Sequence, residues 1–201
     1  ESVEAKLSRA LRGKLLNSAL AEHDKLTLWG CQLNRPKLGL ADDQWDELAR
    51  HSTSVIHNVR FITAHDTHTR HTHDTHTRRS HCGREQAWLL NFEATPIEFE
   101  ESCIKPSYEL MRLCSAHALK QYMFVSSITA AIRNVAGPQG TVPEQVVDDQ
   151  HRASAMGYGQ SKLVTERLAA RYAERFGVPV TIARVGQIAG DSIHGTTHSL
   201  I

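Results

Sequence analysis

The stretch Met156-Gly157-Tyr158-Gly159-Gln160-Ser161-Lys162 decides how the rest of the chain is interpreted. Tyr158 and Lys162 are four residues apart, so at the start of a helix their side chains lie on one face, about one turn from each other. The ammonium of such a lysine lowers the pKa of a phenol from about 10 and can hold sugar hydroxyls. The phenol can then give a proton to a carbonyl oxygen as hydride reaches the carbonyl carbon. The alternative is an ordinary pair of side chains on a surface helix.

The residues around this motif predict a long helix with a strand on either side. Apolar side chains recur at every fourth position, and Gly177 and Pro179 follow as a stop signal. These apolar positions are Val164, Leu168, Tyr172 and Phe176. Residues 180–185 ("VTIARV") have the pattern of a short buried strand, and so have residues 122–125 ("YMFV"), which run into two serines.

The first part of the chain also alternates between helix and strand patterns. Its apolar positions predict an amphipathic helix from Val3 to about Glu22, followed by a short strand at residues 26–29 ("LTLW"). A second helix is expected near Asp42 to Arg50, with Asp42 or Asp43 as its N-cap. Residues 54–58 ("SVIHN") predict the next strand, which ends in two polar residues.

Strands that alternate with helices predict an α/β fold, a partial Rossmann-like doubly wound parallel sheet covered on both faces. A rough helical stripe from Pro96 to about His117, bent or delayed by Pro106, fits this order. Ligands of such sheets lie at the carboxyl ends of the strands. The residues expected at that edge are His57, Asn58, Ser126, Ser127 and the segment after Val185.

One part of a dinucleotide-binding fold is missing from the sequence. Such a fold opens with a strand, a Gly-rich turn and a helix whose amino terminus binds pyrophosphate, and a second strand follows. Neither G-x-x-G-x-x-G nor G-x-G-x-x-G occurs in the chain. Residues 1–201 are therefore interpreted as an incomplete NAD(P)-binding domain that lacks the first strand, the Gly-rich turn and the second strand.

Residues 59–86 differ from the rest of the chain. They contain "HDTHTRHTHDTHTRR", which has neither helical nor strand periodicity, and we expect a disordered insert here. Alternating His and Thr is what a CA-repeat tract encodes, so a retained intron is our hypothesis for this segment. A metal site is the alternative, because zinc or copper binds imidazole. Its candidate ligands are His68, His71, His73 and His76.

Composition narrows the class of protein. The chain has 201 residues, the length of one domain, and its net charge of +1 gives no support to nucleic-acid binding. No apolar run reaches the roughly 20 residues of a membrane span, and no signal peptide is visible. The four cysteines show no close metal-binding spacing, which favours reduced thiols and a cytoplasmic location. They are Cys31, Cys82, Cys103 and Cys114.

Several phrases of the sequence resemble one family. "FVSS", "MGYGQSK", "GVPVTIARVGQIAG", and "LGLADDQWDELA" with "VIHN" are similar to the thioester-reductase branch of the extended short-chain dehydrogenases/reductases. In that branch, reductase domains stand at the carboxyl end of peptide synthetases, hybrid polyketide synthases and adenylate-forming reductases. The resemblance extends from about Leu26 to Gly190, apart from residues 59–86.

The resemblance implies a reaction and a set of site residues. Hydride from NADPH, with NADH not excluded, would reduce an acyl thioester on a carrier-domain phosphopantetheine to an aldehyde or alcohol. Tyr158, Lys162 and Ser127 would be catalytic, with Ser126 and Thr129 as competitors for the hydroxyl role of Ser127. The expected cofactor-binding residues are His57, Asn58, Ser126, Lys162, Val185 and Ile188. The expected substrate contacts are Gln187 and Thr129.

Two other interpretations stay open. One is an extended short-chain reductase or epimerase that acts on a free small substrate. The other is a non-catalytic fragment, because the Gly-rich turn and the carboxyl-terminal substrate-binding region of the relatives are missing. For the same reason we expect this fragment to be inactive by itself.

Overall fold

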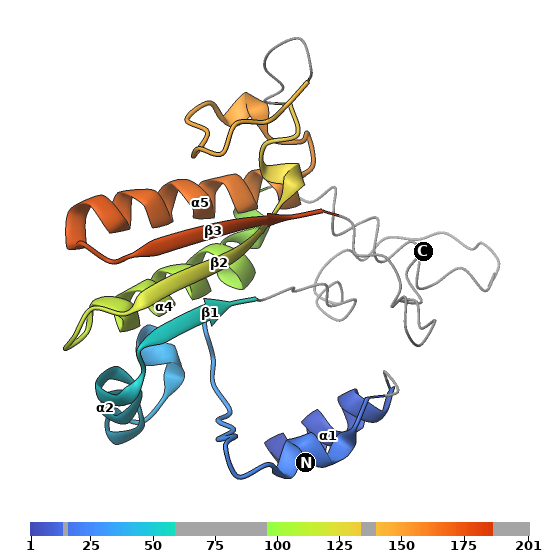
Figure 1. Ribbon diagram of the computed structural model, residues 1–201, viewed down its shortest axis with the longest axis vertical. Coiled ribbons are helices and arrows are strands. Elements are labelled where there is room, and N and C mark those ends of the chain that lie inside the picture. The colour runs from blue at the N-terminus through green and yellow to red at the C-terminus, as the bar shows by residue number, and fades with distance from the viewer. Residues whose placement is uncertain (14–15, 59–95, 134–139, 187–201) are drawn as a thin grey trace, which may run out of the picture.

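The computed structural model describes residues 1–13, 16–58, 96–133 and 140–186. Three parallel strands form one sheet in the order β1 (Ser54–His57), β2 (Gln121–Ser127), β3 (Val180–Val185). Helices α4 (Lys105–Ser115) and α5 (Gly157–Phe176) lie side by side against one face of this sheet (Figure 1). The predicted α/β fold with a parallel sheet is confirmed.

The register of the sheet brings the carboxyl ends of the strands to one edge. His57 pairs with Phe124, and Ser127 pairs with Val185. The predicted strand at residues 180–185 is confirmed at both ends. β2 is longer than predicted and includes both serines, whereas β1 ends at His57, one residue before Asn58.

The predicted long helix is confirmed as α5, which has 20 residues. It ends where Gly177 adopts a left-handed φ of 70° and donates its N–H to the carbonyl of Ala173. The sequence interpretation is partly wrong about which side of the helix is buried, since Val164 and Phe176 are exposed. Polar residues that contact the sheet take up much of the buried side, which an apolar repeat does not reveal.

The core lies between the sheet and the two helices. Side chains from α4, β2 and α5 pack into one cluster. Its buried members are Met111, Cys114, Tyr122, Phe124, Ala169, Tyr172 and Val178. A second cluster joins α2 (Asp42–His51) to α4 through Trp45, Ala49 and Leu113. Trp45 is therefore a packing residue.

The segment before β2 is helical in three short forms. A 3-10 turn (Pro96–Phe99) leads into a π turn (Glu100–Ile104) and then into α4. Pro106 lies in the first turn of α4, where its missing N–H breaks no helical hydrogen bond. The chain is already helical before Pro106, so the prediction that Pro106 bends this helix or delays its start stays a prediction.

Three predictions for the first part of the chain are corrected. The first helix, α1 (Val3–Gly13), is shorter than predicted, and a separate 3-10 turn (Ser18–Glu22) starts at the N-cap Asn17. Residues 26–29 form no strand, because no described strand lies beside them to share hydrogen bonds. The N-cap of α2 is Ala41, whose N–H donates to the side chain of Gln44, so neither Asp42 nor Asp43 caps it.

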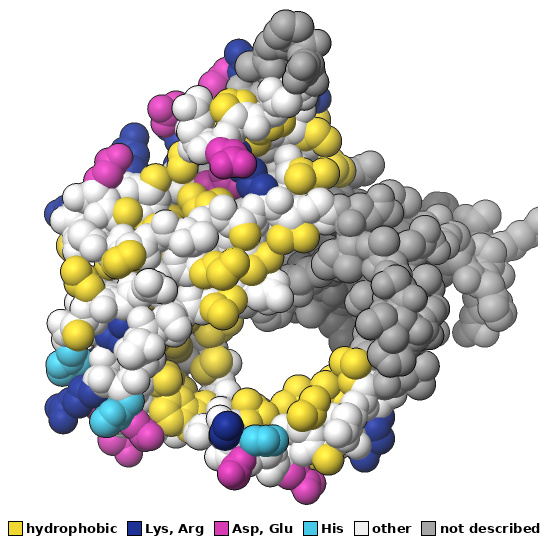
Figure 2. Space-filling view, viewed as in Figure 1, with side chains coloured by type: hydrophobic (Ala, Val, Ile, Leu, Met, Phe, Trp, Pro, Cys, Tyr) yellow, Lys and Arg dark blue, Asp and Glu magenta, His cyan; other side chains and the backbone are white. Residues whose placement is uncertain are grey.

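The prediction of helices on both faces is not met by the described residues. Register places Ile56 and Val185 on the face opposite the core, and they are 68% and 37% exposed. Figure 2 shows apolar side chains along the sheet and around a hollow between the sheet and α1. The insert at residues 59–86 lies outside the described residues. Among the described helices, none is long and apolar enough to cross a membrane.

Candidate active site

Tyr158 and Lys162 lie in the first two turns of α5, at the carboxyl-terminal edge of the sheet. The ammonium Nζ of Lys162 is 5.7 Å from the centre of the Tyr158 ring. The ring of Phe99 meets Tyr158 edge-on, with 6.2 Å between ring centres. The structure thus brings the two predicted side chains together, with Tyr158 half-buried and Lys162 only 5% exposed.

The start of α5 depends on a close backbone contact. A Cβ at Gly159 would collide with the hydroxyl of Ser154 and would lie 2.7 Å from the carbonyl oxygen of Thr129. That carbonyl already accepts the N–H of Ser154 at 2.9 Å. Only glycine lets the first turn of the helix approach the loop after β2 this closely. The glycine between Tyr158 and Lys162 therefore has a packing role.

Lys162 is a buried cation next to a strand end. Its Nζ donates to the backbone carbonyl of Val125 at 3.0 Å and lies 4.7 Å from the ring centre of Phe124. Burial lowers the pKa of Lys162 below that of a free lysine, while Cys103 and Glu166 act in the opposite direction. An ammonium held in this way is a hydrogen-bond donor with a fixed position beside the Tyr158 ring.

The two serine hydroxyls at the end of β2 have different hydrogen-bond partners. Ser126 is buried, and its hydroxyl donates to the carboxylate of Glu166 at 2.5 Å. Ser127 is half-buried, and its oxygen accepts the N–H of Thr129 at 3.3 Å and the hydroxyl of Thr129 at 2.9 Å. The engagement of Ser126 by Glu166 favours Ser127 as the hydroxyl that faces a ligand.

His57 ends β1 and is 2% exposed. Its Nδ1 is hydrogen-bonded to the hydroxyls of Tyr122 at 2.9 Å and Ser107 at 3.1 Å. Burial, together with the charge of Lys162, lowers the pKa of His57 to about 4, so the ring is neutral at pH 7. Its Nε2 is buried and has no hydrogen-bond partner among the described residues.

The remaining predicted contacts fall in three groups. Asn58 is exposed directly after β1, and Val185 is 37% exposed at the end of β3. Thr129 lies in the short helix η6 (Ile128–Ala130), which packs against α5. Gln187 and Ile188 lie outside the described residues, so their predicted contacts stay predictions.

Two charged residues at this site were missed by the sequence interpretation. Glu166 lies one turn after Lys162 and is fully buried, and Arg184 of β3 makes a salt bridge with it. The four-residue spacing that joins Tyr158 to Lys162 also leads to Glu166, and this repeat was the available signal. Phe99 and Phe124, which frame the Tyr/Lys pair, carried no such signal.

The arrangement suits proton transfer to a carbonyl. The phenol of Tyr158 and the buried ammonium of Lys162 lie together at the edge of a parallel sheet where ligands bind, and β2 ends there in Ser127. In the described residues, no group of three or more His, Cys, Asp or Glu side chains is placed to hold a metal ion. The histidine-rich tract that suggested a metal site lies outside the described residues.

Comparison with known proteins finds reductases among the relatives of this chain. The chain is 26% identical to the large subunit of L-2-aminoadipate reductase from Penicillium chrysogenum, over 83% of the chain and 10% of that protein. It is 28% identical to a carboxylic acid reductase from Neurospora crassa, over 85% of the chain and 13% of that protein. The chain thus spans about a tenth of the length of these curated relatives.

Solved structures show the same fold. The terminal R domain of the myxalamid PKS-NRPS biosynthetic pathway superposes with a TM-score of 0.72 at 22% identity. The match covers 98% of this chain and 42% of that domain. A model of the NAD-binding family described as "Male sterility protein" matches residues 86–201, which include the Tyr/Lys motif and β3. This match extends over more than half of the chain, which therefore belongs to the Male sterility protein family of nicotinamide-dinucleotide-binding domains.

Proposed function

We propose that this site is the carbonyl-reducing site of a thioester reductase, which reduces a carrier-bound acyl thioester to an aldehyde with NADPH. The observation that supports the proposal is the contact of Lys162 with Tyr158 and with the strand that ends in Ser127. Support for the substrate class comes from the relatives, which are named as reductases and as peptide synthetases with a terminal R domain.

Each side chain has a role that follows from its position. The Tyr158 phenol donates a proton to the carbonyl oxygen as charge develops on it. The Ser127 hydroxyl donates a second hydrogen bond to the same oxygen, which stabilises the oxyanion. Lys162, fixed against the carbonyl of Val125, orients the ribose of the cofactor and keeps positive charge near the phenol.

The residues present fit the nicotinamide end of the cofactor. Lys162 supplies an ammonium donor at the strand ends, and Asn58 and Val185 are exposed at the same edge. Bound NADPH would supply the hydride. Ser126 contributes to this edge through its backbone, since Glu166 engages its hydroxyl. We also propose that the acyl group arrives on the phosphopantetheine of a carrier domain, in the cytoplasm.

The test uses the 201-residue chain in two steps. Titration with NADPH and with an S-acyl pantetheine measures binding, and aldehyde trapping with a hydrazine measures turnover. Aldehyde formation that requires NADPH supports the proposal and corrects the expectation that the chain is inactive by itself. Binding of both ligands without turnover also supports it and agrees with that expectation.

Two outcomes would contradict the proposal. Reduction of a free ketone, or epimerisation of a sugar nucleotide, with no action on the thioester would assign the site to another short-chain enzyme. Failure to bind both NADPH and the thioester would favour a non-catalytic role. Tyr108→Phe serves as the matched control for variants of Tyr158, because Tyr108 is an exposed tyrosine on α4.

A further inference from the structure

Glu166 and Arg184 form a buried ion pair beneath the candidate active site. Glu166 is 0% exposed, and its carboxylate accepts three hydrogen bonds from Nε and Nη2 of Arg184, the shortest from Nη2 to Oε2 at 2.7 Å. The same carboxylate accepts the hydroxyl of Ser126. One side chain of α5 is thus joined to the ends of both β2 and β3.

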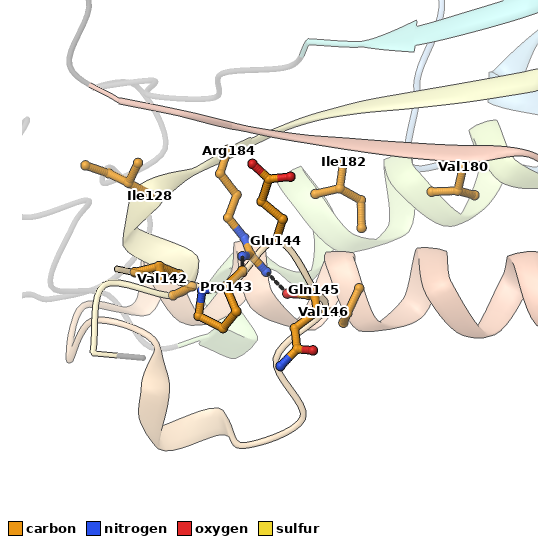
Figure 3. A pocket seen from close by; sticks show the side chains of 10 residues that line it. Ile128, Val142, Pro143, Glu144, Gln145, Val146, Val180, Ile182 and Arg184 are labelled. Carbon is orange, nitrogen blue, oxygen red and sulfur yellow. Dashed lines mark hydrogen bonds between the residues drawn. The ribbon is translucent and has the colours of Figure 1, made fainter. Parts of the chain in front are cut away.

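Arg184 uses its remaining donors on a loop. Its Nη1 donates to the carbonyl oxygen of Pro143 at 3.3 Å, and its Nη2 donates to the carbonyl oxygen of Gln145 at 2.9 Å. Figure 3 shows the side chain of Arg184 reaching from β3 to these two carbonyls. Residues 143–145 are therefore fixed to the sheet from both sides of Glu144.

The fixed loop is one wall of a cavity of about 540 Å³. The other walls come from β3 and from the residue that follows Ser127 in the chain. Its lining is mainly apolar and includes Ile128, Val142, Pro143, Gln145, Ile182 and Arg184 (Figure 3). The cavity thus begins at Ile128, the residue that follows Ser127 in the chain.

This ion pair is an expensive way to gain stability, because Glu166 loses its hydration and Arg184, with 17% of its side chain exposed, loses most of its own. Apolar side chains of similar volume would fill this space at lower cost. A methionine at position 184, however, has no donors for the carbonyls of Pro143 and Gln145. The part of the network that apolar packing cannot replace is therefore the attachment of the loop.

We propose that Glu166 and Arg184 are positioning residues that hold residues 143–145 as a substrate-facing wall of this cavity. Glu166 fixes the direction of the Arg184 fork, and the fork fixes the loop, so that α5 positions both the Tyr/Lys pair and this wall. The identity of the occupant, the acyl part of the thioester, rests on the proposed function. The attachment of the loop does not.

The first measurement is cleavage of the Glu144–Gln145 bond by a glutamyl endopeptidase, followed by mass spectrometry. Cleavage requires the loop to leave the sheet, so its rate reports the population of the open loop. Arg184→Lys keeps the charge but loses the fork, and we expect cleavage at Glu144 about tenfold faster or more. Arg171→Lys, at an exposed position of α5, is the control and should cleave as wild type.

A second variant separates positioning from general stability. S126A/E166M/R184M replaces the whole network with apolar groups, and we expect its thermal midpoint to equal or exceed that of the wild type. Its loop should nevertheless be cleaved as fast as in Arg184→Lys. Wild-type cleavage at Glu144 in this stable variant, or in Arg184→Lys, would overturn the proposal.

Binding of an S-acyl pantetheine tests the occupant separately. We expect the stable triple variant to bind it at least about tenfold more weakly than the wild type, because the wall is no longer in place. Equal binding would overturn the substrate-facing part of the proposal while the loop attachment stands. If the wild-type chain does not bind the thioester, the proposed function and the occupant fail together, and the cleavage result still decides the attachment.

Discussion

The ammonium of Lys162 is hydrogen-bonded to the backbone carbonyl of Val125 at 3.0 Å. This contact ties the first turns of α5 to the strand that ends in Ser127, so the helix and the strand present their polar side chains at a common edge. The lysine is charged, buried and held by a backbone group whose position the sheet determines. The free-energy cost of burying this ammonium can be measured from the pH dependence of unfolding.

Lys162→Met should change how stability depends on pH. Burial lowers the pKa of Lys162 in the folded chain below its unfolded value of 10.5, so the unfolded chain binds more protons between the two values. Wild-type stability should therefore rise relative to the variant as the pH increases through the window below 10.5. Urea unfolding across this range measures the difference, with Lys6→Met as the exposed control. A difference that does not change with pH would contradict the assignment of a buried charge.

His57→Gln should remove part of the acid sensitivity of the fold. The pKa of His57 falls from 6.5 to about 4 on folding, so stability is lost as the pH drops from 6.5 toward 4. The expected difference between wild type and variant over this window is about 3 kcal/mol at most. Chemical unfolding at several pH values measures it. His51→Gln, at an exposed position of α2, should show the wild-type profile.

Gly159→Ala should destabilise the chain by about 1–3 kcal/mol or more, because the added Cβ has no space between Ser154 and the carbonyl of Thr129. Thermal unfolding measures the loss. Gly13→Ala is the matched control, since a Cβ at Gly13 has no neighbour within 4 Å. Equal stability of the two variants would mean that α5 does not approach the loop as closely as described.

Where the chain turns over the acyl pantetheine thioester, Tyr158→Phe should lower kcat by about 10²–10⁴, the usual effect of losing a general acid. The variant keeps the ring contacts with Phe99 and Lys162. Aldehyde formation and NADPH absorbance follow the reaction. Undiminished turnover would assign proton donation to another group.

Ser126→Ala should mainly lower stability, whereas Ser127→Ala should mainly lower turnover. Ser126→Ala removes a donor from the buried carboxylate of Glu166 and should cost about 1–3 kcal/mol of stability. Ser127→Ala should mainly lower kcat, by about 10² or more, if its hydroxyl stabilises the oxyanion. Comparing unfolding and turnover in both variants tests the assignment. A loss of turnover confined to Ser126→Ala would reverse it.

Regular elements with strong local signals were predictable from the sequence. The strand at residues 180–185 has a compact apolar pattern, and α5 is bounded by a Gly-Tyr-Gly start and by Gly177, which adopts the left-handed conformation that stops it. The segment at residues 26–29 has the same apolar character but forms no strand. A strand needs a neighbour for its hydrogen bonds, and local sequence does not say whether that neighbour exists.

The candidate site also has one part that was predictable from the sequence and another that was not. The helical spacing of Tyr158 and Lys162 determined by itself that the two side chains share one face, because four residues are about one turn. Which serine faces a ligand, the burial of His57 and the use of Arg184 on a distant loop were decided only by the tertiary structure. Those contacts join residues that are remote in the chain, and their energies depend on burial and on hydrogen-bond partners that appear only when the sheet and helices pack together.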